Sequence, residues 1–136
     1  MQEPPMMQPK GLNFTFFVKD FDKSLTFYRD VLGLRYKTEW RSQYSRGVIF
    51  DIGNDGEFQF YGPPEGKAQT EASPAGVKIA FLVDDVDAHY TRIKAAGAEI
   101  VEEINDKPWG DRSFGIKDPD GLILYIYSKI AEKETP

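Results

Sequence analysis

The sequence predicts an α+β fold in which two copies of a βαβββ unit form a curved, mainly antiparallel sheet with an open cleft. The first observation is that strand, helix and turn signals run through the same order twice. The second is that matching landmarks keep almost the same spacing, since the interval from Asp20 to Asp85 exceeds that from Gly33 to Gly97 by a single position. The third is a stretch rich in glycine and proline between the two halves.

The first unit is expected over residues 12–61, after a leader at 1–11 that is rich in proline. It starts with a strand at 12–18, because these residues are rich in aromatic side chains. A helix follows, with Asp22 as its N-cap and Gly33 as its stop. Its apolar stripe consists of Phe21, Leu25, Tyr28 and Leu32. Three more strands are predicted at 34–40, 47–52 and 57–61, the last two joined by a turn at 54–56.

The second unit is expected over residues 77–128, between a linker at 62–76 and a charged tail at 129–136. A strand at 77–83 leads to a helix that Asp85 or Asp87 caps and that Gly97 ends. Strands follow at 98–104, 113–116 and 122–127, with a turn at 118–121 in which Asp118 and Asp120 serve as turn formers. Alternation along the strands predicts that the core includes Phe14, Phe16, Phe81, Leu122 and Leu124.

Composition excludes several classes of function. The 17 basic and 22 acidic residues give a net charge of −5 without a clustered basic face, so nucleic acid is not an expected partner. No apolar run approaches the roughly 20 residues of a membrane span, so no membrane partner is expected either. The chain has no cysteine, which excludes disulfides and thiolate sites and fits a cytoplasmic location. Its one histidine, His89, falls in a helix and is interpreted as a surface residue.

Three strings carry a resemblance to a known family. They are VKDFDKSLTFYRDVLGL at 18–34, IAFLVDDVDAHYTRIKAAGAEI at 79–100 and PWGDRSFGIKDPDGLILYIY at 108–127. In this order they resemble the glyoxalase/bleomycin resistance protein/dioxygenase (vicinal oxygen chelate) superfamily, over about residues 12–128. The resemblance implies the repeated βαβββ fold, and it also implies a homodimer.

The resemblance also implies four metal-ligand positions, usually histidine in the first strand and glutamate in the last strand of each unit. Here the histidine positions fall on Asn13 and Lys78, which correspond to each other in the repeat. The glutamate positions fall on Gln59 and Tyr125, with a register that a slip of one or two residues would change. Two carboxamides, an ammonium and a phenol suit a transition metal poorly, so we expect no metal and no cofactor. Alternation places Glu57 on the face of Gln59, which supplies at most one carboxylate.

Four further side chains are candidate ligand contacts: Trp40, Tyr61, Trp109 and Arg112. A tryptophan is also an ordinary core residue, and Arg112 is interpreted first as the ion-pair partner of Asp111, with a ligand contact as the alternative. Lys78 either binds an anionic group or packs its stem and pairs with a carboxylate.

The resulting hypothesis is a metal-free protein that binds a small organic molecule, aromatic or cationic, in a cleft and acts as a homodimer. No catalytic residue is assigned. The alternatives are a metal-dependent lyase, isomerase or dioxygenase of the glyoxalase type, and a partner-binding module that has lost its site. The sequence does not identify the ligand.

Overall fold

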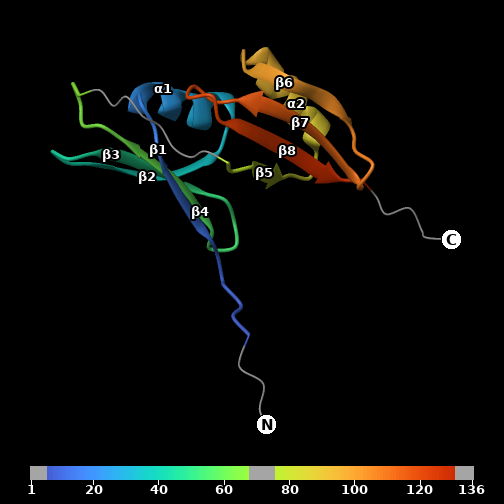
Figure 1. Ribbon diagram of the computed structural model, residues 1–136, viewed down its shortest axis with the longest axis horizontal. Coiled ribbons are helices and arrows are strands. Elements are labelled where there is room, and N and C mark those ends of the chain that lie inside the picture. The colour runs from blue at the N-terminus through green and yellow to red at the C-terminus, as the bar shows by residue number, and fades with distance from the viewer. Residues whose placement is uncertain (1–5, 68–75, 131–136) are drawn as a thin grey trace, which may run out of the picture.

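A computed structural model describes residues 6–67 and 76–130 and contains two four-stranded mixed sheets, one in each half of the chain (Figure 1). The first sheet has the order β1-β4-β3-β2 and the second has the order β5-β8-β7-β6. In each, the first strand pairs with the last in parallel and the other pairs are antiparallel. The strands are β1 (Asn13–Phe17), β2 (Arg35–Arg41), β3 (Arg46–Asp51), β4 (Glu57–Gly62), β5 (Ile79–Leu82), β6 (Glu99–Asp106), β7 (Asp111–Lys117) and β8 (Ile123–Lys129). The predicted α+β class and repeated βαβββ order are confirmed.

The expected leader, linker and tail lie partly outside the described residues, and their boundaries stay predictions. Within the described ranges, β4 runs to Gly62 and β8 runs to Lys129, so each closing strand is slightly longer than its sequence signal.

The helix of the first unit changes type half-way along. It begins as α1 (Phe21–Leu25) and continues as the π-helix η1 (Thr26–Val31), in which the Leu32 amide donates to the Phe27 carbonyl at 2.8 Å. A π turn absorbs one additional residue in a helix. The second unit has the regular α2 (Val86–Ala95). The interval from Gly33 to Gly97, where the helices end, is a single position shorter than the interval from Asp20 to Asp85, where they begin. The first helix is therefore one residue longer than the second, as the π turn requires.

Both helices begin at an aspartate, and one of the predicted caps is wrong. The first helix starts at Phe21, so its N-cap is Asp20, whose carboxylate accepts the Lys23 amide at 3.2 Å. Asp22 therefore lies in the first turn and forms a two-bond ion pair with Arg46 instead. In the second unit Asp85 is the cap and accepts the Ala88 amide at 3.1 Å.

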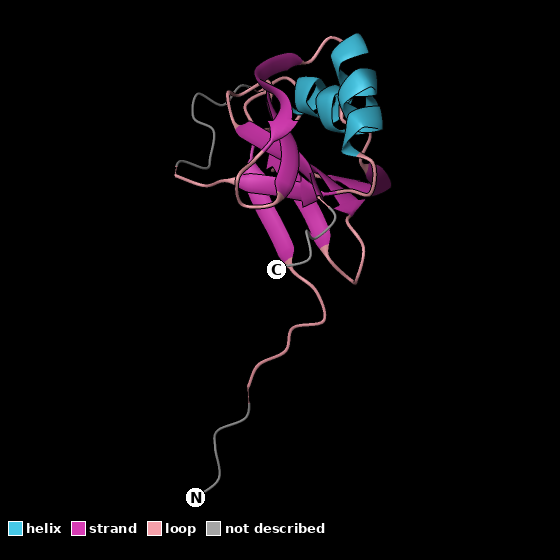
Figure 2. Ribbon diagram, turned by 90° about the vertical axis from the view of Figure 1, so that its right-hand side faces the viewer, coloured by secondary structure: helices cyan, strands magenta, loops and turns pink. Residues whose placement is uncertain are grey.

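The two helices lie together on one side of the strands, and the core lies between (Figure 2). Of the five predicted core residues, Phe16 and Leu124 are buried, with 3% and 0% exposure. Phe14, Phe81 and Leu122 pack against this core but stay partly exposed. Phe81 stays partly exposed because it lies on β5, an edge strand, although its ring centroid is 5.5 Å from that of the buried Phe58.

Side chains on the helix side join the two units. The Tyr28 hydroxyl donates to the Asp118 carboxylate at 2.7 Å, and both residues are buried. From the other unit, the Arg92 guanidinium donates to the Val31 and Leu32 carbonyls that end the first helix. The two halves therefore pack as one body. Among the described residues, no helix has the length and apolar character needed to cross a bilayer.

Candidate functional site

Each sheet has one face turned away from the helices, and we call these two surfaces the open face. Alternation assigns its residues, because the intervening side chains pack into the core. On the first sheet the open face carries Asn13, Thr15, Phe17, Glu57, Gln59 and Tyr61, and on the second it carries Lys78, Ala80, Leu82, Ile123, Tyr125 and Tyr127. All four family positions identified in the sequence therefore lie on this face.

In the first unit, Asn13 and Gln59 lie on the neighbouring strands β1 and β4, where Thr15 pairs directly with Gln59. Both amides already have partners. Asn13 Oδ1 accepts the Thr15 hydroxyl at 2.7 Å, and Gln59 Nε2 donates to Glu57 Oε1 at 3.1 Å. The other Glu57 oxygen accepts the Lys37 ammonium at 2.6 Å, and this hydrogen bond lowers the pKa of Glu57. The Glu57 carboxylate therefore stays ionised, and the Lys37 ammonium balances its charge.

In the second unit, Lys78 and Tyr125 are in direct contact. The Lys78 ammonium lies over the Tyr125 ring, 4.6 Å from its centroid. The same ring lies over Gly115 of β7, since a Cβ added there would be 3.1 Å from Tyr125 Cε1. The phenol ring thus lies next to both Gly115 and the Lys78 ammonium. Among the described residues, no hydrogen bond, ion pair or ring contact links this pair to Asn13 or Gln59.

Of the three candidate aromatic contacts, Tyr61 and Trp40 lie on the open face, because Gly47 of β3 pairs with both. The ring of Tyr61 can meet a ligand there. Its ring centroid is 3.9 Å from that of Phe17. Trp40 packs over Gly47 in the β2–β3 hairpin and donates its indole N–H to Ser45 Oγ at 3.2 Å. These two contacts hold its half-buried ring against the hairpin. Trp109 is 67% exposed in the turn between β6 and β7. The structure does not bring the two tryptophans together.

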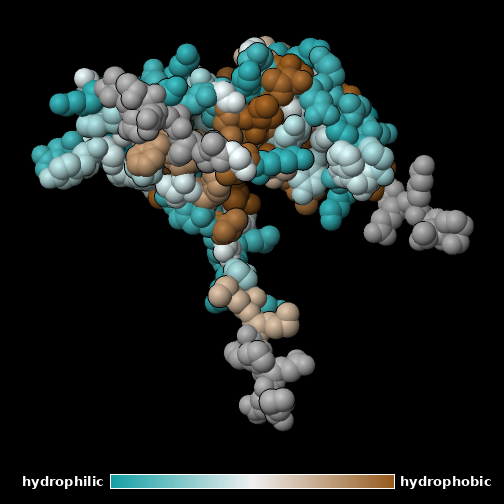
Figure 3. Space-filling view, in the orientation of Figure 1, coloured by the Kyte–Doolittle hydropathy of each residue, from teal (hydrophilic) through white to brown (hydrophobic). Residues whose placement is uncertain are grey.

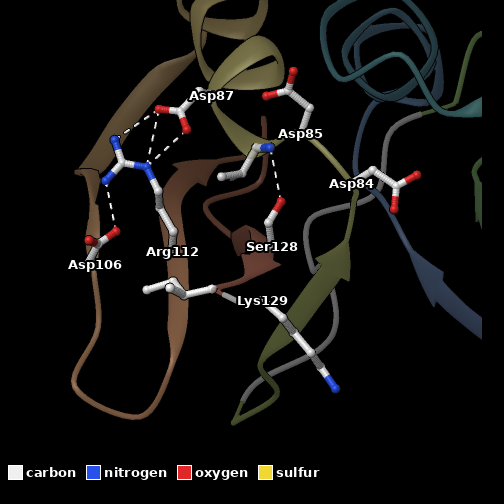
Figure 4. Close-up of a pocket in the computed structure, with 9 residues that line it drawn as sticks. Asp84, Asp85, Asp87, Asp106, Arg112, Ser128 and Lys129 are labelled. Carbon is white, nitrogen blue, oxygen red and sulfur yellow. Dashed lines mark hydrogen bonds and ion pairs between the residues drawn. The ribbon is translucent and has the colours of Figure 1, made fainter. Parts of the chain in front are cut away.

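Arg112 lies away from the open face, at a pocket of about 460 Å³ beside the start of α2 (Figure 4). Its guanidinium donates to Asp87 at 2.9 Å and to Asp106 at 3.0 Å. The expected partner Asp111 is wrong, because adjacent side chains on β7 point to opposite faces of the sheet. Asp85 is used as the helix cap and Ser128 accepts the Val86 amide, so the groups that line this pocket hold α2 in place.

Exposed apolar side chains on the open face are a feature that the sequence analysis missed. Leu82 is 56% exposed, and Phe17 and Ile123 are each 37% exposed. Figure 3 shows hydrophobic residues gathered along the middle of the molecule, with hydrophilic residues around them. The signal was present as the alternation Ala80–Leu82 on β5, opposite the side of Ile79 and Phe81 that packs against the core.

Residues 12–126 match the family model described as Glyoxalase/Bleomycin resistance protein/Dioxygenase superfamily. The chain belongs to this superfamily. Among its relatives, the uncharacterized protein YwbC of Bacillus subtilis is 35% identical over 82% of this chain and 91% of its own. A probable lactoylglutathione lyase of Vibrio parahaemolyticus is 32% identical over 80% of this chain and 83% of its own. The crystal structure of TnmS3, an antibiotic binding protein from Streptomyces sp., superposes with a TM-score of 0.71 at 21% identity and covers 92% of this chain and 99% of its own, which shows a shared fold.

The four residues at the superfamily's metal positions do not fit a transition metal. An ammonium at Lys78 has no lone pair and repels a cation, and the amides of Asn13 and Gln59 are weak ligands that are already hydrogen bonded. Across the residues that the structure describes, no group of three or more His, Cys, Asp or Glu side chains could hold a metal ion.

Proposed function

We propose that the protein is a metal-free member of the superfamily that binds a small organic molecule on the open face. The observation that carries the proposal is the contact between Lys78 and Tyr125, which fills two of the four metal positions with a cation and a phenol. Asn13 and Gln59 add amide donors and acceptors on the open face of the first sheet. Polar groups of this kind beside exposed apolar side chains such as Leu82 suit an organic ligand.

The exposed side chains support an aromatic rather than a purely polar ligand. Phe17 and Tyr61 offer ring surface on the first sheet, and Leu82 and Tyr127 offer apolar surface on the second. TnmS3 is an antibiotic binding protein, and its similarity indicates that this fold can serve binding. Of the two ligand types that the sequence suggested, aromatic and cationic, we therefore propose the aromatic one.

The second candidate is a metal-dependent lyase, isomerase or dioxygenase, which the name of the Vibrio parahaemolyticus relative favours. Such an enzyme needs carboxylate and imidazole ligands for its metal. Glu57 is the carboxylate next to the site, and Lys37 neutralises it. This candidate ranks below the binder for that reason. A module that binds only a protein partner ranks third.

The proposal includes a homodimer in the cytoplasm. An exposed apolar group such as Ile123 on the open face would lose contact with water if a second copy covered that part of it. Sedimentation of the purified protein at twice the mass of one chain is the expected result.

Metal analysis separates the binder from the enzyme. Protein purified without a chelator should carry far less than one metal ion per chain. Zinc, nickel or iron(II) should leave its melting temperature unchanged, because a cation that binds only the folded state would raise it. Stoichiometric metal that survives dialysis would overturn the proposal and favour the lyase. A thermal-shift screen with aromatic compounds then separates the binder from a partner-binding module, which should show no shift.

A further inference from the structure

Lys78 has no carboxylate partner among the described residues, unlike Lys37, Lys94 and Lys107. Lys37 is held by Glu57 at 2.6 Å, and Lys107 is held by Glu102 at 2.7 Å. Within residues 6–67 and 76–130, Lys78 forms no ion pair and no hydrogen bond, and its contact is the Tyr125 ring. An aromatic ring attracts an ammonium through its face but accepts none of its N–H groups in a full hydrogen bond. The ammonium is thus positioned, while its donors stay available.

The surroundings of Lys78 define what would bind next to it. Tyr125 is fixed by Gly115 below it, and Tyr127 follows two residues later on the same face. Neither tyrosine hydroxyl has a hydrogen-bond partner among the described residues. Ala80 and Leu82 run alongside on β5, paired with these two tyrosines. The second sheet therefore presents one positive charge, two hydroxyl groups and an apolar strip.

We propose that Lys78 takes over the role of positive charge that a metal would have at this position, and that the ligand is an aromatic acid. Its anionic oxygen, in a carboxylate, sulfonate or phenolate, would accept from the Lys78 ammonium and the Tyr125 hydroxyl. Its ring would lie over Leu82 and Tyr127. A cationic ligand is disfavoured here, because Lys78 would repel it. This inference rests on the proposed function and narrows its ligand class.

A matched pair of fluorescent probes tests the charge. Anilinonaphthalene sulfonate and its uncharged parent N-phenylnaphthylamine share the same rings and differ in one sulfonate. We expect the wild-type protein to bind the sulfonate about tenfold more tightly, which is the usual effect of a hydrogen bond to a charged group. Lys78→Met should abolish this preference while leaving the affinity for the neutral probe unchanged. Lys78→Arg should retain the preference, because it keeps the charge.

Two further variants locate the probes and complete the design. Tyr127→Ala should weaken both probes, because it removes ring surface rather than charge. Lys23→Met changes an exposed lysine on the helix side and should alter neither affinity. Equal affinity of the wild-type protein for both probes, or a preference that survives Lys78→Met, would overturn the assignment of Lys78 and leave the binder intact. If neither probe shows saturable binding that Tyr127→Ala weakens, both the proposed function and this inference fail.

Discussion

At the scale of single residues, the core contains one polar atom without a partner among the described residues. Ser24 is fully buried on α1, and its hydroxyl forms no hydrogen bond there. Burying an unsatisfied hydroxyl costs free energy, and alanine is the better helix former. Ser24→Ala should therefore raise the free energy of unfolding by about 1 kcal/mol. Urea unfolding measures this as a higher midpoint with an unchanged slope.

The exposed Thr26 of the same helix supplies the control for Ser24. Thr26→Ala changes helix propensity without removing a buried hydroxyl, so its gain should be smaller. A Ser24→Ala variant that is less stable than the wild-type protein would mean that the hydroxyl has a partner, such as an ordered water.

At the scale of elements, the β2–β3 hairpin depends on one glycine. Trp40 and Gly47 are paired across the hairpin, and a Cβ at residue 47 would overlap the Trp40 ring. Gly47→Ala should destabilise the protein by about 1–3 kcal/mol, the usual cost of overpacking. The overlap is with one ring. The double variant Trp40→Ala/Gly47→Ala should therefore lose less free energy of unfolding than the sum of the losses of the two single variants.

Tryptophan fluorescence gives a second measurement of the same hairpin. The chain has two tryptophans, so Trp109→Phe leaves Trp40 as the sole reporter. In that background Gly47→Ala should shift the Trp40 emission to the red, because the displaced indole becomes more exposed. An unshifted spectrum with additive free energies would contradict the packing of Trp40 on Gly47.

The same scale shows why much of the fold could be predicted from the sequence. The alternation of strands and the repeated landmarks are local signals, and they predicted every described strand and helix with small shifts at the ends. The choice of cap was not local. Asp20 and Asp22 both suit an N-cap, and the contact that decides between them is with Arg46, on a strand of the same unit.

The residues of the candidate site also fall into those that local sequence predicts and those that only the fold determines. Alternation predicted that Glu57 and Gln59 share one face of their strand, and both lie on the open face of β4. The contacts of Trp40 and Arg112 could not be predicted, because the fold brings their partners close: Gly47 lies across a hairpin and Asp87 lies on a helix. No sequence spacing encodes how the two sheets are set relative to each other.

At the scale of the whole molecule, the buried pair of Tyr28 and Asp118 links the two units. Burial raises the pKa of Asp118, although Tyr28 and the amides of Asp120 and Leu122 donate to it. The folded state therefore holds the proton more tightly than the unfolded state. The contribution of this group to stability is present below the unfolded pKa of about 3.9 and is lost as the pH rises through the raised pKa.

Comparison with Asp118→Asn isolates this contribution. Asparagine keeps an acceptor for the amides but does not titrate, so the wild-type protein should lose stability relative to the variant as the pH rises from about 4. The ion-paired Asp22 and Asp87 act in the opposite direction and at lower pH, because their pKa values are lowered by Arg46 and Arg112. Unfolding measured from about pH 4 to neutrality checks the prediction, and a difference that does not vary with pH would contradict it.

The last prediction concerns the assembled open face and tests whether the four family positions still converge. The quadruple variant Asn13→His, Gln59→Glu, Lys78→His and Tyr125→Glu replaces two amides, an ammonium and a phenol with two imidazoles and two carboxylates. If these side chains meet, within one chain or across a dimer, the variant should bind nickel or zinc. Metal at a hundred times its dissociation constant should then stabilise the folded state by about 2.7 kcal/mol. A triple variant that keeps Lys78 should show little response, because the ammonium repels the ion. Equal responses of the wild-type and quadruple proteins would show that the positions do not form one site.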